Sequence, residues 1–434
     1  MPRFPLPLAA TLLAALLAAC ASAGPRAADP DSPETPAETP VDVPPAPEQA
    51  EPDGLPADLT PSDYRQPGAE PPAGVPPEAE PPRPVAPAVQ ATPAWADPQQ
   101  GRALLARLLP RKMPDRAGWS DDIFNAFKAL KIPYTAEYFC AAAATIEQES
   151  TWQADPVVPG LGKMVWGQIE QKAHAKGLPL TLVQAALLVS SRDGRSYKAR
   201  IDALRTEREM NALFEEMADE AKRLGLPLSM ANPIRTGGPM QVSIAFAAGH
   251  AKAWPYPYPI KDGIRHEVFT RRGGVYFGIA NLLHYRVNYG EMRYRFADYN
   301  AGRFSSRNAA FQAAVARVSK RKIGLDGDLL RYEAGVPSSA PSDTLAAVRA
   351  IAGRLGLGAA AIERDLALEK DGGFDQTALY RRVFELADQA AGKPLPRAVL
   401  PQIRLKSPKI TRKLTTAWFA ERVEGRYRTC LGRQ

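Results

Sequence analysis

The chain has little cysteine and histidine, and neither residue is arranged to hold a metal ion. Only three Cys and four His occur among 434 residues. No Cys-x-x-Cys pair or Cys/His cluster with the spacing of a structural zinc site is present. The sequence therefore predicts no metal centre. The scattered histidines are expected to have structural roles: they are His174, His250, His266 and His284.

No hydrophobic run is long enough to span a bilayer permanently. The longest, residues 6–19, follows a single arginine and is too short for a transmembrane helix but typical of a signal peptide. It ends in Leu-Ala-Ala-Cys, the form of a bacterial lipobox, which predicts that residues 1–19 are removed and Cys20 is lipidated. An ordinary signal peptide is the alternative. Ala21, rather than Asp, after Cys20 favours the periplasmic side of the outer membrane.

Aromatic and aliphatic residues are sparse in the next segment, residues 20–97, which is rich in Pro, Ala, Asp and Glu. Such a composition cannot bury enough apolar surface to offset the entropy lost on folding. We expect an extended, disordered tether between the lipid anchor and the rest of the chain. The remaining residues carry a net charge of +18, with 51 basic and 33 acidic side chains from residue 101 onward.

Alternating strand patterns of useful length are missing from the rest of the chain, which shows helical periodicity instead. Residues 120–131 and 136–149 read as helices, the second alanine-rich and buried, and Thr206 with Glu209 forms a capping box. Further helices are expected over 241–254, 275–286, 308–319, 342–355, 376–391 and 411–428. The prediction is an all-α fold. Cys140 and Cys430 either pair in an oxidising compartment, or Cys140 is a buried free thiol.

Three short segments carry the chemical information, and each lies next to an expected helix. The first is Glu-Gln-Glu-Ser-Thr-Trp over 147–152, and the second is Gly-Pro-Met-Gln over 238–241. The third is Ala-Asp-Tyr-Asn-Ala-Gly over 297–302. Each alone is common, so any inference depends on their order.

Taken in order, these segments resemble the three signatures of the soluble lytic transglycosylases in the lysozyme-like superfamily, over about residues 120–320. The resemblance implies a lysozyme-like helical domain at 98–322, with a helical insertion at about 153–236 and a helical extension at 323–434. It implies Glu149 as the catalytic acid and base, with no cofactor. The residues expected to line the sugar groove or to position Glu149 are Ser150, Met240, Gln241, Tyr299 and Asn300. The whole body is also similar to a group of proteobacterial lipoproteins.

The chemistry explains why a buried glutamate suits this reaction. Cleaving a glycosidic bond requires a proton on the leaving oxygen, and burial at the end of an apolar helix disfavours the carboxylate form. Most glycosidases need a second carboxylate. Lytic transglycosylases use one, which then accepts the proton of the sugar's own 6-hydroxyl and gives a 1,6-anhydromuramoyl end.

Three departures keep other interpretations open. Residues 153–236 separate the first two motifs, Pro239 replaces a leucine, and Asp298 stands where the family has alanine. A scaffold that binds glycan or an envelope protein without cleaving it is therefore the main alternative. A muramidase would need a second acid, for which Asp155 and Glu170 are the nearest candidates.

The predicted compartment restricts the partners. The basic body suits peptidoglycan carboxylates or lipid headgroups, and nucleic acid is not expected outside the cytoplasm. Glu147 is a rival carboxylate that we expect to face solvent. The Pro-aromatic run 254–259 either stacks on sugar rings or packs on the body.

Overall fold

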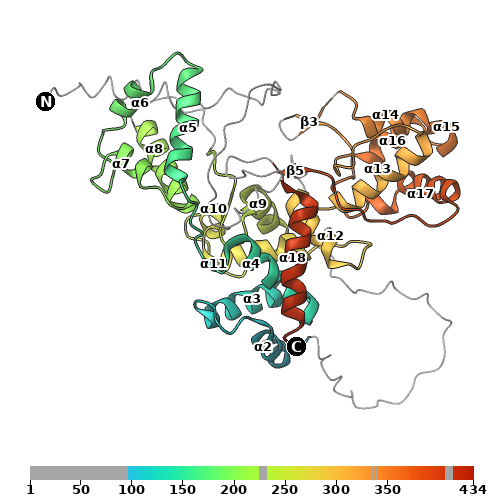
Figure 1. Ribbon diagram of the computed structural model, residues 1–434, viewed down its shortest axis with the longest axis horizontal. Coiled ribbons are helices and arrows are strands. Elements are labelled where there is room, and N and C mark those ends of the chain that lie inside the picture. Colours follow the sequence, from blue (N-terminus) through green and yellow to red (C-terminus); the bar gives the residue numbers. More distant parts are fainter. Residues whose placement is uncertain (1–95, 224–231, 334–335, 339, 406–413) are drawn as a thin grey trace, which may run out of the picture. The chain divides into compact units, whose positions relative to one another are not determined.

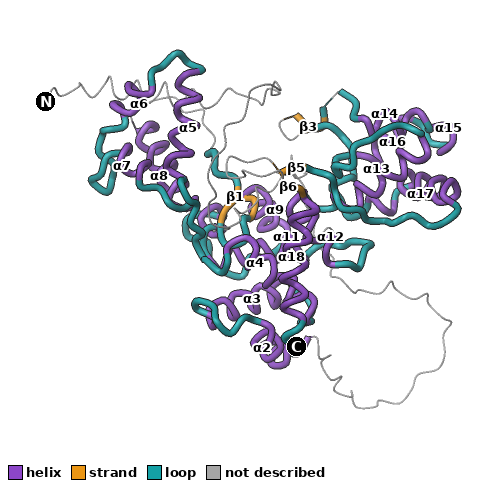
Figure 2. Tube along the Cα trace, viewed as in Figure 1, coloured by secondary structure: helices purple, strands orange, loops and turns teal. Residues whose placement is uncertain are grey.

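The computed structural model describes residues 96–223, 232–333, 336–338, 340–405 and 414–434. The expected signal peptide, the expected lipidation site Cys20 and nearly all of the expected tether lie outside the described residues. Seventeen α-helices dominate the described part and each strand has two residues (Figure 2), so the expectation of a nearly all-α fold is confirmed. None of the helices in this part is long and apolar enough to cross a membrane.

The chain divides into two compact units. One unit comprises the described residues of 155–237, and the other comprises those of 96–154 and 238–434. The bounds of the first unit differ by one or two residues from those of the expected insertion.

The larger unit begins with three helices and resumes after the insertion. Its helices are α2 (Pro98–Leu108), α3 (Arg116–Leu130), α4 (Ala136–Ser150), α9 (Ile244–Ala253), α10 (Ile264–Val268), α11 (Arg271–Leu283), α12 (Met292–Ala301), α13 (Ser305–Ser319), α14 (Asp343–Ala350), α15 (Ala352–Leu355), α16 (Ala359–Leu366), α17 (Ala378–Ala391) and α18 (Thr416–Leu431), with the 3-10 turn η3 (Phe374–Gln376). Its short strands are β2 (Val242–Ser243), β3 (Tyr332–Glu333), β4 (Val336–Pro337), β5 (Arg404–Leu405) and β6 (Leu414–Thr415). β3 pairs antiparallel with β4, and β5 with β6.

Helix α4 lies at the centre of this unit. Thr135 caps it by accepting a hydrogen bond from the Tyr138 backbone, as its sequence predicts. Twelve of its fifteen residues are buried, because α2, α11 and α18 all pack against it. Its small alanine side chains allow neighbouring helices to approach closely. Figure 1 shows α18, at the far end of the chain, lying alongside α4.

The last 120 or so residues of the chain serve two different parts of this unit. Helices α13 to α17 surround a hydrophobic core of their own, with Phe311, Leu366 and Phe384 among its buried residues. Helix α18 leaves that core and packs between α4 and α12. The expected extension at 323–434 is therefore in part a separate helical core and in part a wall of the α4 region.

The smaller unit has its own hydrophobic core. Its elements are α5 (Leu161–His174), α6 (Leu180–Ala186), α7 (Tyr197–Asp202), α8 (Glu207–Arg223) and β1 (Thr236–Gly237). The predicted capping box of α8 is confirmed, because the Thr206 and Glu209 side chains each accept the other's backbone N–H. The unit buries residues such as Leu161, Tyr197 and Leu213.

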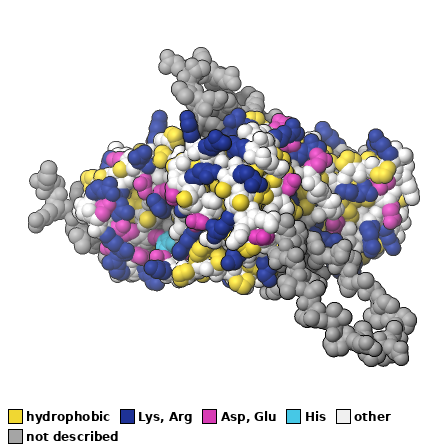
Figure 3. All heavy atoms as spheres, turned by 90° about the horizontal axis from the view of Figure 1, so that it is seen from below, with side chains coloured by type: hydrophobic (Ala, Val, Ile, Leu, Met, Phe, Trp, Pro, Cys, Tyr) yellow, Lys and Arg dark blue, Asp and Glu magenta, His cyan; other side chains and the backbone are white. Residues whose placement is uncertain are grey.

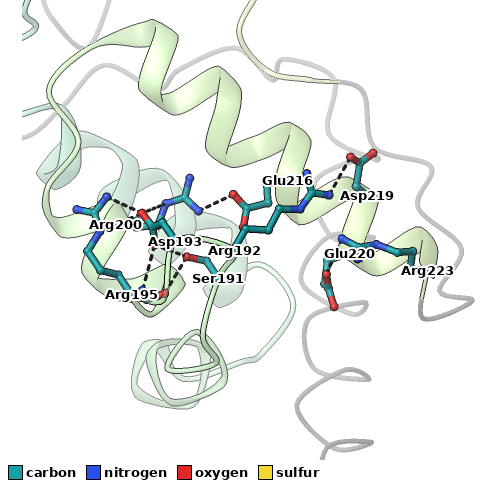
Figure 4. A network of polar contacts seen from close by, with 9 residues as sticks. All are labelled: Ser191, Arg192, Asp193, Arg195, Arg200, Glu216, Asp219, Glu220 and Arg223. Carbon is teal, nitrogen blue, oxygen red and sulfur yellow. Dashed lines mark hydrogen bonds and ion pairs between the residues drawn. The ribbon is translucent and has the colours of Figure 1, made fainter.

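A charged network orders one loop of the smaller unit (Figure 4). The Glu216 carboxylate accepts from the Arg192 backbone at 2.7 Å and from the Arg200 guanidinium at 2.6 Å. Asp193 pairs with Arg195 at 2.7 Å. These contacts hold the loop that exposes Leu188 to solvent.

Candidate functional site

Glu149 lies in the last turn of α4, and its side chain is only 4% exposed. The two residues that follow the helix, Thr151 and Trp152, both have left-handed backbone, with φ of 49° and 62°. For non-glycine residues this conformation costs roughly 1–2 kcal/mol each. Strain of this kind persists where the surrounding structure enforces it, and it is concentrated in functional sites.

Buried polar groups flank Glu149 on both sides in the sequence. Neither the amide nitrogen nor the amide oxygen of Gln148 has a hydrogen-bond partner among the described residues, and the same holds for the indole N–H of Trp152. The Trp152 ring meets Trp119 edge-on, with centroids 5.3 Å apart. Most buried polar atoms in folded proteins are hydrogen-bonded. The unpaired polar atoms of Gln148 and Trp152 are therefore unusual, and they lie near Glu149 in the sequence. No role was expected for Gln148 or Trp152 from the sequence. Their position within the first motif is the feature that could have pointed to them.

The second motif is fitted closely against α11. Gly238 has φ of +74°, and a side chain there would collide with the Val268 carbonyl oxygen. Pro239 lies over Gly274 and Met240 over Gly278, two glycines four residues apart on the same face of α11. Pro239 stands where the lytic transglycosylase signature has leucine, and it fits here because Gly274 has no side chain. Met240 is fully buried, so its side chain packs on α11 instead of lining an open groove.

A hydrogen bond joins the third motif to the second. The Tyr299 hydroxyl on α12 donates to the Met240 carbonyl oxygen at 2.5 Å. The next residue, Asn300, is fully buried, and its amide atoms have no hydrogen-bond partner among the described residues. Gln241, beside Met240, is buried and has left-handed backbone with φ of 49°. The structure therefore brings together residues that lie 59 positions apart.

Asp298 stands in the third motif where the lytic transglycosylase signature has alanine. It is fully buried. Its carboxylate accepts hydrogen bonds from the Tyr289 hydroxyl, the Tyr285 hydroxyl at 3.3 Å and the Ser306 backbone N–H at 2.7 Å. Burial raises the pKa of Asp298 above its usual range, although the hydrogen bonds from Tyr289 and Ser306 partly oppose this. The residue therefore connects α12 to the start of α13 and is neither a surface charge nor an exposed acid.

Other residues singled out from the sequence have local partners. The Ser150 hydroxyl is buried and donates to the Ile146 carbonyl at 2.9 Å. In the smaller unit, Asp155 pairs with Arg208 at 2.8 Å and Glu170 is exposed. No cluster of three or more His, Cys, Asp or Glu that could hold a metal ion occurs among the residues described.

The Pro-aromatic run packs on the body of the larger unit. The Trp254 indole donates to the Ala129 carbonyl at 3.1 Å, and the Tyr256 hydroxyl donates to Glu267 at 2.6 Å. Tyr256 also stacks on Phe277, with centroids 4.9 Å apart. These two aromatic rings are therefore part of the packing around α11.

Cys140 and Cys430 form a disulfide with Cα atoms 5.5 Å apart. The bond joins α4, which carries Glu149, to α18 near the end of the chain. Both cysteines are buried. Of the two alternatives left open by the sequence, the structure has the paired one.

One protein-family model matches the part of the chain that contains all of the site residues described above. The family model described as "Protein of unknown function (DUF1615)" matches residues 112–433. The chain belongs to this family. The DUF1615 match includes all three motifs, the smaller unit and both disulfide cysteines, and it begins after the acidic, proline-rich segment.

A curated relative supports the same assignment. This DUF1615 chain is 44% identical over 329 residues to the "Uncharacterized protein YaiW" of Escherichia coli (strain K12), a match that covers 76% of this chain and 89% of the relative. No solved structure matches the chain. The comparisons thus give the family and leave the chemistry to the site itself.

Proposed function

We propose that this protein cleaves peptidoglycan glycan strands as a lytic transglycosylase, at the β-1,4 bond between N-acetylmuramic acid and N-acetylglucosamine. The observation that supports this most strongly is the hydrogen bond from Tyr299 to the Met240 carbonyl, which joins the second and third motifs. Glu149, the acid of the first motif, ends the buried helix α4, which packs on the same α11 that supports Met240. A lysozyme-like fold for the larger unit is part of the proposal.

In this reaction Glu149 acts twice. Its carboxylic acid first donates a proton to the glycosidic oxygen, and the bond from that oxygen to the muramic acid C1 breaks. The resulting carboxylate then accepts the proton of the 6-hydroxyl, whose oxygen bonds to C1. The products are a free 4-hydroxyl on one fragment and a 1,6-anhydromuramoyl end on the other. Glu149 ends protonated as it began, and no water or cofactor is consumed.

The proposed compartment is the periplasmic face of the cell envelope, with a lipid anchor on Cys20 in the outer membrane and residues 20–97 as a tether. The disulfide between Cys140 and Cys430 favours an oxidising compartment. Charge fits the same proposal. Lys and Arg side chains are spread over the face drawn in Figure 3 with Asp and Glu between them, a distribution that suits an extended anionic polymer such as the wall.

The test is digestion of purified sacculi with residues 21–434, comparing wild type with Glu149→Gln. Mass spectrometry of the products should show anhydro-ended muropeptides from wild type and none from the variant. Glu137→Gln is the matched control, because it makes the same change at an exposed position on the same helix and should leave the products unchanged. Equal release by wild type and Glu149→Gln would refute the assigned role.

A second candidate is a scaffold that binds peptidoglycan or an envelope protein without cleaving it. The observation that favours it is burial: Glu149, Met240, Tyr299 and Asn300 are all less than a tenth exposed. In this case both proteins would sediment with sacculi and release nothing. Muropeptides with reducing ends would instead indicate a hydrolase that uses water.

A further inference from the structure

A hollow lies between α4 and α18, and of the three motifs it touches only the first, through Glu147. It has a volume of about 330 Å³ and is lined by Glu147, Glu421, Arg422, Gly425, Arg426 and Thr429. Five of these residues come from one long face of α18, and Glu147 faces them from α4. Glu147 is half-buried here, although the sequence analysis expected it to face solvent. It lies about 200° around the helix from Glu149, so the hollow does not belong to the site described above.

A glycine in the middle of α18 makes room for this hollow. A Cβ atom added at Gly425 would meet no atom of another element within 4 Å. Glycine in a helix interior destabilises the helix by roughly 1 kcal/mol relative to alanine. Since no close packing requires Gly425, the space above it is the structural consequence of this residue.

Two arginines flank the glycine, and part of each guanidinium group lacks a hydrogen-bond partner among the described residues, although Nη1 of Arg426 donates to the Arg422 carbonyl oxygen at 3.4 Å. The Nε atoms of Arg422 and Arg426 are buried and have no hydrogen-bond partner among the described residues. Arg428 of the same helix, which does not line the hollow, pairs with Glu424 at 2.6 Å. Like charges four residues apart repel each other, so the arrangement is unfavourable unless an anion lies between the two guanidinium groups.

The electrostatics of the hollow agree with this description. Burial lowers the pKa of Arg426, the nearby Glu147 carboxylate raises it, and the neighbouring Arg422 lowers it. Arg422 lies over the Trp418 ring at 5.3 Å, a contact that orients its guanidinium without neutralising it. The rim carries the opposite charge in Glu147 and Glu421.

We propose that this hollow binds a small zwitterion, a free dipeptide with an ammonium group at one end and a carboxylate at the other. Arg422 and Arg426 hold its carboxylate, and Glu147 with Glu421 holds its ammonium group. Planar guanidinium groups bind carboxylates through paired hydrogen bonds, and a volume of about 330 Å³ is enough for a dipeptide of small residues. This binding does not depend on whether Glu149 cleaves glycan.

The experiment is titration calorimetry on residues 21–434 with D-alanyl-D-alanine as the probe. Wild type should bind it saturably, and Arg426→Gln should weaken binding about tenfold or more, the loss expected for one charge-assisted contact. Gly425→Leu should abolish binding by filling the hollow, while a leucine there also favours the helix. Arg428→Gln, which removes a guanidinium that does not line the hollow and is paired with Glu424, should bind as wild type does.

Two further probes test the zwitterion itself. N-acetylation of the dipeptide removes its ammonium group and should weaken binding through Glu147 and Glu421. Inorganic phosphate should bind less tightly than the dipeptide. No binding of the dipeptide, equal binding by Gly425→Leu, or tighter binding of phosphate would each overturn the proposal. Loss of sacculus digestion in Glu149→Gln with dipeptide binding retained would separate this site from the proposed active site.

Discussion

Reduction of the disulfide between Cys140 and Cys430 should destabilise the larger unit more than any single substitution considered above. The bond joins residues 290 positions apart. Loop-closure entropy for a loop of this length corresponds to about 5–6 kcal/mol at 25 °C. This figure is an upper value, because engineered and native disulfides commonly contribute about 2–4 kcal/mol. The expected loss on reduction is therefore at least about 2 kcal/mol.

The assay compares the oxidised and the reduced wild-type protein, so that every side chain is the same in both samples. Urea unfolding followed by circular dichroism gives the free energy of unfolding in each state. Cys140→Ala with Cys430→Ala should match the reduced protein and should no longer respond to reductant. A difference below about 0.5 kcal/mol between oxidised and reduced protein would refute the reasoning, as would two titratable thiols in protein purified without reductant.

Three other predictions follow from named contacts. Tyr299→Phe removes the hydrogen bond to the buried Met240 carbonyl, so it should lower the free energy of unfolding by about 1–3 kcal/mol in urea titrations, and no loss would contradict the contact. Gly278→Ala places a Cβ atom 2.6 Å from the Met240 Cβ, which should cost about 1–3 kcal/mol, whereas Gly425→Ala should be neutral or stabilising in the same assay. Burial raises the pKa of Glu369 to about 7, so the folded state keeps a proton that the unfolded chain releases above about pH 4.5. Stability should therefore fall by roughly 3 kcal/mol between pH 4.5 and pH 7, and melting curves of Glu369→Gln should show a smaller fall.

Local signals in the sequence predicted several elements well because their causes are local. The cap at Thr135 and the alanine-rich run after it predicted α4, and the capping box predicted the start of α8. Such features depend on residues within one or two helical turns of each other. The order of the three motifs likewise led to residues that the fold brings together at the Tyr299 contact.

Other features depend on partners far away in the sequence and could not be predicted in this way. Helix α3 begins at Arg116, four residues before the start expected at residue 120, because Asp115 caps it while paired with Arg271 from α11. Helix α12 was not predicted as a helix. Two charged residues in it, Arg295 and Asp298, are buried, which removes the apolar period that identifies a core helix.

Burial of those two charges is possible because tertiary contacts satisfy them. Arg295 donates to the Leu282 and Tyr285 carbonyls, each at 3.2 Å. Asp298 accepts from two tyrosine hydroxyls and from the Ser306 backbone. Nothing in a linear pattern distinguishes such residues from solvent-exposed charges. The Arg422 and Arg426 pair of α18 was missed for the related reason that Glu147 meets it only in the folded chain.

The position of α18 has a consequence for the order in which the protein can be made. A ribosome releases α4 long before α18, yet α4 is covered on one side only by that last helix. The nascent chain must therefore keep α4 incompletely packed until α18 has been made. A product that stops before Thr416 lacks this cover and also lacks Cys430. Proteases should thus degrade such a product faster than a chain that contains the sixteen residues of α18.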